Sequence, residues 1–299
     1  MRVLHIDTGA AMQGGQWQVL YLLQGLAQRG IESRLAAPAG SPLLAATRKS
    51  GCDAQPLGFG RMVRDSGRFD LVHAHDAGAH TVALLLRPPL VVSRRVAFPL
   101  KRTPFSRHKY SRPAQFLAVS RYVQNVLMNG GIPEEKISVV YDGVPLPEDI
   151  AFDHRSRLIA LDSESPGKGK AIIEEAARMA GVPVHFSSAL LRDLPEAWLF
   201  VYITELEGLG SAALLAMAYG VPVLASRAGG LPEIVEDRVT GLLTTNNAND
   251  VAAAMKCLHE DRAAALHLGQ NGRAKVEQRF TADHMVENTI RAYEKVVSC

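Results

Sequence analysis

The residues best suited to chemistry lie between positions 204 and 235, where a carboxylate stands beside two glycine turns. The carboxylate is Glu207, and the turn glycines are Gly208, Gly210, Gly229 and Gly230. Each turn follows a strand-like run, so we expect both at the carboxyl edge of one parallel sheet, where backbone N–H groups can converge on an anion. A carboxylate at that edge can accept hydrogen bonds from hydroxyl groups. This stretch therefore predicts a site for an anionic ligand that carries hydroxyls.

Two further groups fall at predicted strand ends in the first half of the chain. Gly14 and Gly15 follow the first strand and open a helix, where glycine allows close backbone approach and the helix N-terminus offers unpaired N–H groups. Turn formation alone is the alternative, and the spacing is not that of the G-x-G-x-x-G dinucleotide motif. His75 and Asp76 end the strand-like run 70–74, which makes them candidates for substrate contact or simply satisfied strand-end groups.

Strand-like and helix-like segments alternate along the chain. In the first half we expect strands at 1–6, 31–37, 69–74, 89–93, 116–119 and 137–141, with helices at 16–29, 41–50, 79–86 and 120–128. In the second half we expect strands at 157–161, 182–186, 198–203, 221–226 and 241–244, with helices at 170–180, 211–219, 248–260, 262–278 and 282–297. This alternation predicts parallel sheets covered by helices. A length of 299 residues favours two domains, with a hinge at 141–147.

The charge is unevenly distributed, although the net charge is only +3. Residues 1–150 carry 18 Lys and Arg against 11 Asp and Glu, whereas residues 151–299 carry 15 against 19. The segment 77–133 holds no acidic residue and nine basic ones, namely Arg87, Arg94, Arg95, Lys101, Arg102, Arg107, Lys109, Arg112 and Arg121. Such a segment attracts anionic partners, with a merely solubilising surface as the alternative. It contains no recognition motif of a nucleic-acid-binding domain, so nucleic-acid binding is not favoured.

Cysteine usage and hydropathy favour the cytoplasm. Cys52, Cys257 and Cys299 are far apart and lack metal-ligand spacing, which is typical of a reducing compartment. No apolar run approaches the ~20 residues that a membrane span needs. The N-terminus is too quickly polar for a signal peptide and reads as a first strand.

Several motifs in register resemble the group 1, GT4-like glycosyltransferases. Residues 204–235 are similar to that family's donor-site pattern, E-G-F-G-x-x-x-x-E-A-M-A-x-G-x-P-V-x-A followed by G-G-x-P-E-I-V. Segments 14–15, 72–75, 118–120, 139–144 and 241–243, and a closing helix through Tyr293, follow in the family's order. The resemblance covers most of the chain and implies an α/β fold of two Rossmann-like domains facing a cleft, the GT-B fold. It places an acceptor-side domain at 1–145, a shortened nucleotide-sugar domain at 146–280, and at 281–299 a closing helix that packs back on the N-terminal domain.

The resemblance also implies an activity. A sugar would pass from a nucleotide sugar to an anionic acceptor, a lipid-linked or phosphorylated glycan, with retention, as in cell-envelope polysaccharide or lipopolysaccharide synthesis. Phosphate contacts would fall to Lys168, Gly14 and Gly15. Glu207 would hold the donor sugar, and His75 or Arg95 would lie near the reacting centre. Because the chain has no D-x-D sequence, we expect no metal or other cofactor, so basic groups must stabilise the leaving diphosphate. The acid-free segment adds an expectation of peripheral contact with anionic lipid at the inner face of the cytoplasmic membrane.

The chain departs from the family pattern at the nucleotide end of the donor pocket. The second Glu of the family's E-x7-E motif is Leu215, and the Arg of its R-x4-K pair is Ser163. Only 38 residues separate Lys168 from Glu207, which leaves less room than the family uses for β-α units. Two alternatives therefore stay open. One is a GT-B-like protein with an impaired donor site that acts as a binding or assembly partner, and the other is a nucleotide-sugar epimerase of the same fold.

Overall fold

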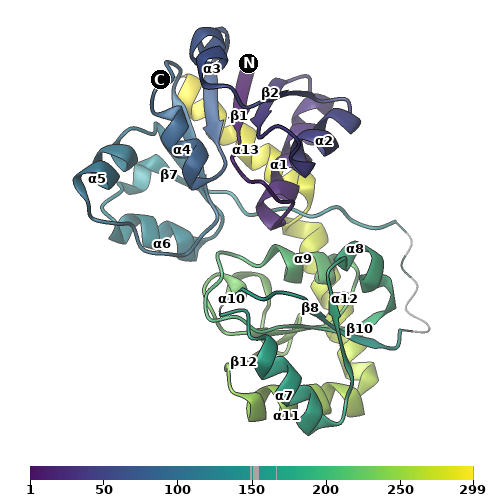
Figure 1. Ribbon diagram of the computed structural model, residues 1–299. Coiled ribbons are helices and arrows are strands. Elements are labelled where there is room, and N and C mark those ends of the chain that lie inside the picture. The colour runs from purple at the N-terminus through teal and green to yellow at the C-terminus, as the bar shows by residue number, and fades with distance from the viewer. Residues whose placement is uncertain (149, 151–154, 166, 299) are drawn as a thin grey trace. The chain divides into compact units, whose positions relative to one another are not determined.

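The computed structural model describes residues 1–148, 150, 155–165 and 167–298. They form two compact units, Met1–Gly143 with Ala282–Cys299, and Val144–Thr281 (Figure 1). Both units are built on parallel sheets with helices between the strands, which confirms the predicted α/β fold class. Cys52 and Cys257 are free thiols, and Cys299 lies outside the described residues.

The first unit contains a seven-stranded parallel sheet in the order β3-β2-β1-β4-β5-β6-β7. Its strands are β1 (Arg2–Ile6), β2 (Glu32–Ala37), β3 (Asp53–Pro56), β4 (Leu71–Ala74), β5 (Leu90–Arg94), β6 (Gln115–Ala118) and β7 (Ile137–Val139). The strand order reverses between β1 and β4, where His5 is the register partner of His73. Such a reversal opens a crevice at the carboxyl ends of the strands, which is where ligands of open α/β sheets bind.

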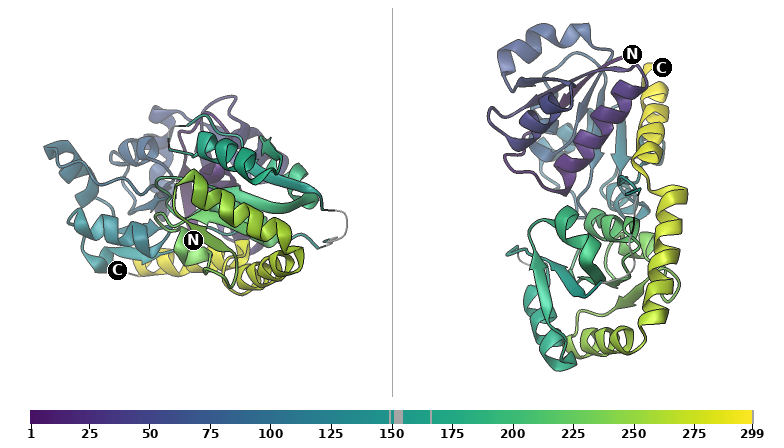
Figure 2. Two further views of the ribbon diagram at one scale, coloured as in Figure 1. Left: turned by 90° about the horizontal axis from the view of Figure 1, so that it is seen from below. Right: turned by 90° about the vertical axis from the view of Figure 1, so that its right-hand side faces the viewer.

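Helices cover both faces of this sheet. They are α1 (Gly14–Gln28), α2 (Pro42–Lys49), α3 (Phe59–Asp65), α4 (Ala77–Ala83), α5 (Pro104–Ser111), α6 (Arg121–Asn129) and α13 (Ala282–Val297), with 3-10 turns at Ser66–Arg68 and Glu134–Lys136. The C-terminal helix α13 runs beside α1 (Figure 2). A Cβ added at Gly25 would lie 2.5 Å from Val286 Cγ2, so the close approach of α1 and α13 requires glycine at that position.

The second unit contains a five-stranded parallel sheet in the order β12-β11-β10-β8-β9. Its strands are β8 (Arg157–Leu161), β9 (Val184–Ser187), β10 (Ala197–Tyr202), β11 (Val223–Ser226) and β12 (Leu242–Thr244). Its helices are α7 (Lys170–Ala180), α8 (Leu190–Asp193), α9 (Ser211–Ala218), α10 (Leu231–Ile234), α11 (Ala248–Glu260) and α12 (Arg262–Arg279), with a 3-10 turn at Leu194–Glu196. Here the strand order reverses between β8 and β10.

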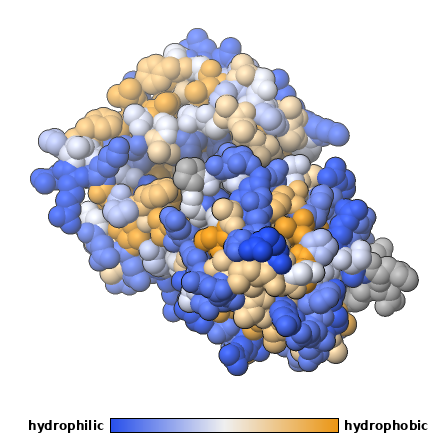
Figure 3. Space-filling model, turned by 60° about the horizontal axis from the view of Figure 1, so that its bottom comes forward, coloured by the Kyte–Doolittle hydropathy of each residue, from blue (hydrophilic) through white to orange (hydrophobic). Residues whose placement is uncertain are grey.

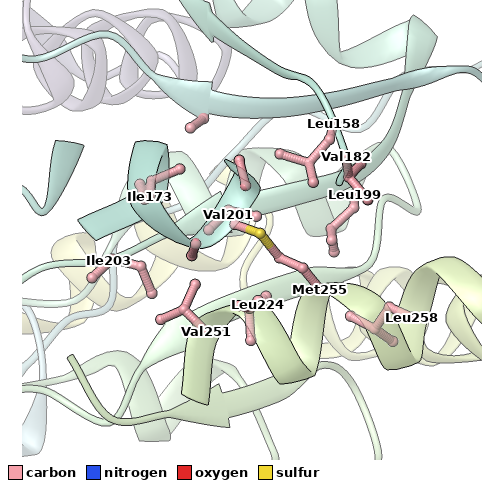
Figure 4. Close-up of a cluster of buried hydrophobic side chains, with 14 of the residues drawn as sticks. Leu158, Ile173, Val182, Leu199, Val201, Ile203, Leu224, Val251, Met255 and Leu258 are labelled. Carbon is pink, nitrogen blue, oxygen red and sulfur yellow. The ribbon is translucent and has the colours of Figure 1, made fainter. Parts of the chain in front are cut away.

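One face of this second sheet packs against α7 and α11. Met255 of α11 reaches into a buried cluster with Leu199 and Val201 of β10, and Ile173 of α7 joins the same cluster (Figure 4). Each of these side chains is at most 2% exposed. This core fixes the strands whose carboxyl ends carry Lys168 and Glu207.

Among the described residues, no helix combines the length and apolarity that crossing a bilayer would require.

Candidate functional site

Lys168 and Glu207 meet at the carboxyl edge of the second sheet. Lys168 follows β8, Glu207 follows the neighbouring strand β10, and the Lys168 Nζ lies 2.7 Å from Glu207 Oε2. The Tyr202 hydroxyl, at the end of β10, donates to the same carboxylate oxygen at 2.6 Å. We call these three residues the triad. The sequence predicted Lys168 and Glu207 as ligand-binding residues and missed Tyr202, since no motif position marks it.

The triad is partly shielded from water, with the Lys168 and Glu207 side chains 28% and 17% exposed. Burial and the neighbouring Glu207 carboxylate raise the pKa of Tyr202 well above its usual value, so the phenol stays a hydrogen-bond donor at neutral pH. The second carboxylate oxygen, Glu207 Oε1, accepts from the Gly208 N–H at 3.1 Å. Oε2 thus accepts two hydrogen bonds and Oε1 only one, so a ligand hydroxyl can still donate to Oε1.

The two glycine turns pack against each other through their backbones. A Cβ at Gly229 would lie 1.9 Å from the Glu207 carbonyl oxygen, and one at Gly230 would lie 2.2 Å from that of Gly208. The Gly230 N–H donates to the Glu207 carbonyl at 3.1 Å, so this amide is engaged within the protein. Gly210 precedes α9 with a φ of 106°, a conformation that favours glycine. The glycines therefore set the position of the Glu207 backbone.

A closed hydrogen-bond cycle holds the loop that carries Glu207. The Thr204 N–H donates to Ser226 Oγ at 2.8 Å, and the Ser226 hydroxyl donates to Asn246 Oδ1 at 2.6 Å. The Asn246 side-chain amide completes the cycle by donating to the Thr204 carbonyl at 3.0 Å. The cycle joins the ends of β10 and β11 to the segment after β12, and the sequence contained no signal for it.

The two departures from the family pattern lie in the same unit. Ser163 Oγ accepts from the Ser165 N–H at 3.3 Å, and Ser163 lies with Lys168 and Tyr202 at a crevice too narrow to hold a water molecule. Leu215 lies on α9 and is only partly buried, whereas its neighbour Leu214 is fully buried. The side chain at position 215 therefore lies outside the buried face of α9, so a polar side chain there would keep contact with water.

Three histidines gather at the carboxyl ends of β1 and β4 in the first unit. His5 Nδ1 lies 3.0 Å from His75 Nε2, while the two ring nitrogens of His73 lie 2.6 Å from the Tyr293 hydroxyl and 2.8 Å from Ser93 Oγ. Burial lowers the pKa of His5 to about 3 and holds the pKa values of His73 and His75 well below 6.5. The three imidazoles are therefore neutral at pH 7.

The geometry of these rings is that of a hydrogen-bonded network. Ligating atoms of the three histidines lie within 4.8 Å of one another, a spacing compatible with a metal ion. His5 Nε2 and His75 Nδ1 are buried without a hydrogen-bond partner among the described residues. Both His73 nitrogens are in hydrogen bonds, so a metal ion could bind His73 only in place of one of those contacts. His75, predicted as catalytic, is 5% exposed and lies inside this network.

Arg95 lies beside the histidine network and the start of α1. Its Nε donates to Asp142 Oδ1 at 3.0 Å, and both residues line a small pocket of about 10 Å³, room for about one water molecule, with His73 and Ser93. Arg95 Nη1 is buried and has no hydrogen-bond partner among the described residues. A Cβ at Gly15 would lie 4.0 Å from Arg95 Cδ, so the structure brings the predicted Arg95 and the Gly14–Gln28 helix N-terminus together.

The Asp76 carboxylate connects the segment after β1 to the start of α4 in the first unit. Its carboxylate accepts from the Thr8 N–H at 2.5 Å and from the Thr8 hydroxyl at 2.6 Å. It also caps α4 by accepting from the N–H groups of Gly78 and Ala79. Asp76 is thus a satisfied strand-end group, one of the two alternatives that the sequence left open.

Two family profiles match the chain in the order expected from its two units. The profile of Glycosyltransferase Family 4 matches residues 12–147, and that of the Glycosyl transferases group 1 matches residues 181–275. The chain belongs to the group 1 glycosyltransferases of GT-B fold, which confirms the resemblance read from its motifs.

Relatives and solved structures agree with this membership. Alpha-maltose-1-phosphate synthase of Mycolicibacterium smegmatis is 38% identical over 110 residues, a match that covers 34% of this chain and 28% of that enzyme. An uncharacterised glycosyltransferase of Methanocaldococcus jannaschii is 23% identical over 80% of this chain and 79% of its own length. The structure of Anabaena HepE in complex with UDP and glucose aligns with a TM-score of 0.84 at 18% identity, covering 98% of this chain and 99% of the other. Sucrose-phosphate synthase of Thermosynechococcus elongatus aligns with a TM-score of 0.78 at 16% identity, covering 99% of both chains.

Proposed function

We propose that the protein transfers a hexosyl group from a nucleotide-sugar donor to a lipid-linked or phosphorylated glycan acceptor, with retention of anomeric configuration. The observation that carries the proposal is the triad. Its Lys168 ammonium contacts the Glu207 carboxylate at the carboxyl edge of the second sheet, the kind of edge where ligands of this fold class bind. The Anabaena structure with UDP and glucose supports a donor of this kind.

In the proposed reaction the bond between the sugar C1 and the diphosphate oxygen breaks, and a bond from C1 to the acceptor hydroxyl oxygen forms on the same face. The acceptor proton leaves with the departing diphosphate oxygen. Lys168 neutralises the charge that develops on this leaving group. Glu207 accepts hydrogen bonds from hydroxyls of the donor sugar. Because the chain has no D-x-D sequence, we propose that the Lys168 ammonium acts in place of a metal ion.

His75 has a different role in this proposal. Its lowered pKa and its burial next to His5 make it a poor proton carrier at neutral pH. We assign it to positioning, because its ring ties the end of β4 to the end of β1, next to Arg95.

The acid-free segment 77–133 supports an anionic acceptor and contact with anionic lipid, as in synthesis of cell-envelope polysaccharide or lipopolysaccharide at the inner face of the membrane. The structure exposes six of its nine basic residues, namely Arg87, Lys101, Arg102, Arg107, Arg112 and Arg121. Lys109, expected in the same basic surface, is instead buried and donates to the Ala77 carbonyl and the Thr81 hydroxyl, both at 2.7 Å. The Lys109 ammonium therefore joins α5 to α4 and does not face an anionic partner.

A second candidate is a donor-site-impaired protein that acts as a binding or assembly partner of an active transferase. Leu215 and Ser163 favour it, because the groups that would hold the nucleotide ribose and phosphate in the family pattern are missing.

Thermal unfolding with UDP-, GDP- and ADP-hexoses separates these candidates, because a ligand that binds only the native state raises its melting temperature. The proposed transferase requires a shift with one donor, followed by release of free nucleotide only when an acceptor is added. A shift without turnover would favour the binding partner. Conversion of the nucleotide sugar without an acceptor would instead identify an epimerase.

A further inference from the structure

Exposed apolar side chains concentrate in the acid-free segment 77–133. Of the fourteen large apolar side chains exposed among the described residues, six lie there, namely Leu85, Val96, Phe98, Phe105, Tyr122 and Met128. The segment contains less than a fifth of the chain, so these side chains are enriched about twofold. Apolar residues reach the surface elsewhere too (Figure 3). The distinctive feature of this segment is that they coincide with basic residues and a complete lack of acidic ones.

Hydrogen bonds hold the backbone segments that carry Phe98 and Phe105. Arg94 joins the loop after β5 to α5, because its Nη2 donates to the Phe98 carbonyl at 2.6 Å and its Nη1 donates to the Tyr110 hydroxyl at 3.0 Å. Thr103 Oγ caps α5 two residues before Phe105. Despite these anchors, the side chains of Phe98 and Phe105 are 63% and 59% exposed. Helix α5 lies at the edge of its unit in Figure 1.

The sequence around the two rings alternates apolar and cationic groups. Lys101 and Arg102 lie between Phe98 and Phe105, Arg107 follows, and all three basic side chains are exposed. An anionic bilayer satisfies both features, since lysine and arginine bind the headgroup phosphates while the rings enter the apolar boundary beneath them.

We propose that loop 95–103 and helix α5 form a membrane-docking surface that inserts Phe98 and Phe105 into an anionic bilayer. Lys101, Arg102 and Arg107 hold the headgroups around the inserted rings. This inference rests on the proposed function in one respect only, namely that docking would give the enzyme access to a lipid-linked acceptor. The docking itself requires neither donor nor turnover.

Co-sedimentation of the full chain with vesicles tests the proposal. We expect binding to vesicles of phosphatidylcholine with phosphatidylglycerol and none to phosphatidylcholine alone. The double variant Phe98→Ser/Phe105→Ser should bind the anionic vesicles at least about tenfold more weakly, because two apolar anchors are lost. The matched control is Phe59→Ser, which removes a ring that is 50% exposed on α3 of the same unit and should bind like the wild type. Lys101→Ser/Arg102→Ser/Arg107→Ser should also weaken binding and flatten its dependence on salt.

Insertion is measured directly with Phe98→Trp and Phe105→Trp. Each new indole should be quenched by brominated lipid, relative to the background of Trp17 and Trp198 in the wild type. Unchanged binding of the double Ser variant, or no quenching of either indole, would overturn the proposal. A self-association that the double Ser variant abolishes would assign the surface to a second copy instead. Donor binding by all variants should equal that of the wild type, so a wild type that binds vesicles but no nucleotide sugar refutes the proposed function alone.

Discussion

Lys168 and Glu207 are in direct contact, with the ammonium nitrogen 2.7 Å from the carboxylate oxygen that the Tyr202 hydroxyl also contacts. The residue proposed for the leaving phosphate and the residue proposed for the donor sugar therefore hold each other in the donor-free protein. A diphosphate that binds Lys168 releases one oxygen of Glu207 for sugar hydroxyls. The two ends of the proposed donor pocket are coupled through this one contact.

Glu207→Ala should abolish donor-dependent transfer, with a loss of at least about 100-fold, because the sugar loses its carboxylate partner. The native fold should persist, since the side chain is partly exposed and removing it costs about 1 kcal/mol. Initial rates and melting temperatures would be measured together. The matched control is Glu205→Gln, an exposed carboxylate two residues earlier, which should retain activity. Full activity with an earlier melting transition would mean that Glu207 only stabilises the N-terminus of α9.

Leu215→Glu should tighten nucleotide binding by about 1 kcal/mol or more if the missing carboxylate is what weakens the donor site. The partly exposed position of Leu215 predicts that the variant stays folded. Leu214→Glu is the contrasting control, because that side chain is fully buried and an unpaired charge there should unfold the protein. Calorimetric titration with nucleotides and thermal unfolding would be compared. Destabilisation of Leu215→Glu with no gain in affinity would favour the non-catalytic binding partner.

Gly229→Ala should damage both stability and activity. The added Cβ would lie 1.9 Å from the Glu207 carbonyl oxygen, so the turn that carries Glu207 must move, at a cost of about 2–4 kcal/mol. Gly60→Ala provides the control, because nothing lies within 4 Å of its added Cβ and alanine favours the helix α3. Urea unfolding would give the free energy of unfolding of each variant. An equal response of the two variants would show that the contact between the glycine turns does not constrain the site.

The fold could be predicted from the alternation of apolar runs and turn residues, because each run is long enough to be periodic. Strand β3 and helices α3, α5, α8 and α10 were missed. Asp53–Pro56 ends in proline and contains two polar residues, and Pro104–Ser111 is largely polar with only a weak apolar face. Their structures depend on pairing with β2 and on Lys109 reaching α4. The local sequence of a segment does not indicate such partners elsewhere in the chain.

The candidate site was predictable only in part, for a similar reason. Motif positions placed Lys168 and Glu207 at neighbouring strand ends, and the structure brings them together. The partners Asp142 and Asn246 come from contacts between distant segments, which no spacing rule identifies. Tyr202 is near Glu207 in the sequence, but no motif position marks it. His75 lies at the predicted strand end but inside a buried network, because His5 on the neighbouring strand covers it.

Acidification should destabilise the protein, because His5, His73 and His75 are neutral in the folded state. Their folded pKa values are lowered, so the unfolded chain binds more protons, and stability falls as the pH drops below about 6.5. Each histidine contributes about 1.4 kcal/mol per pH unit in this range. We expect His75→Gln to reduce the slope of unfolding free energy between pH 6 and pH 5 by about one proton. Equal slopes for His75→Gln and the wild type would contradict the buried network.

Acceptor-dependent release of nucleotide by wild type and Lys168→Met, measured in the presence of EDTA, tests the central claim most directly. The account predicts that one nucleotide sugar binds the wild type and that added acceptor releases free nucleotide without a divalent metal. Lys168→Met should bind the same donor at least about 30-fold more weakly, because the leaving diphosphate loses its cation. A donor that binds both proteins equally, or turnover that EDTA abolishes and Mg²⁺ restores, would contradict it.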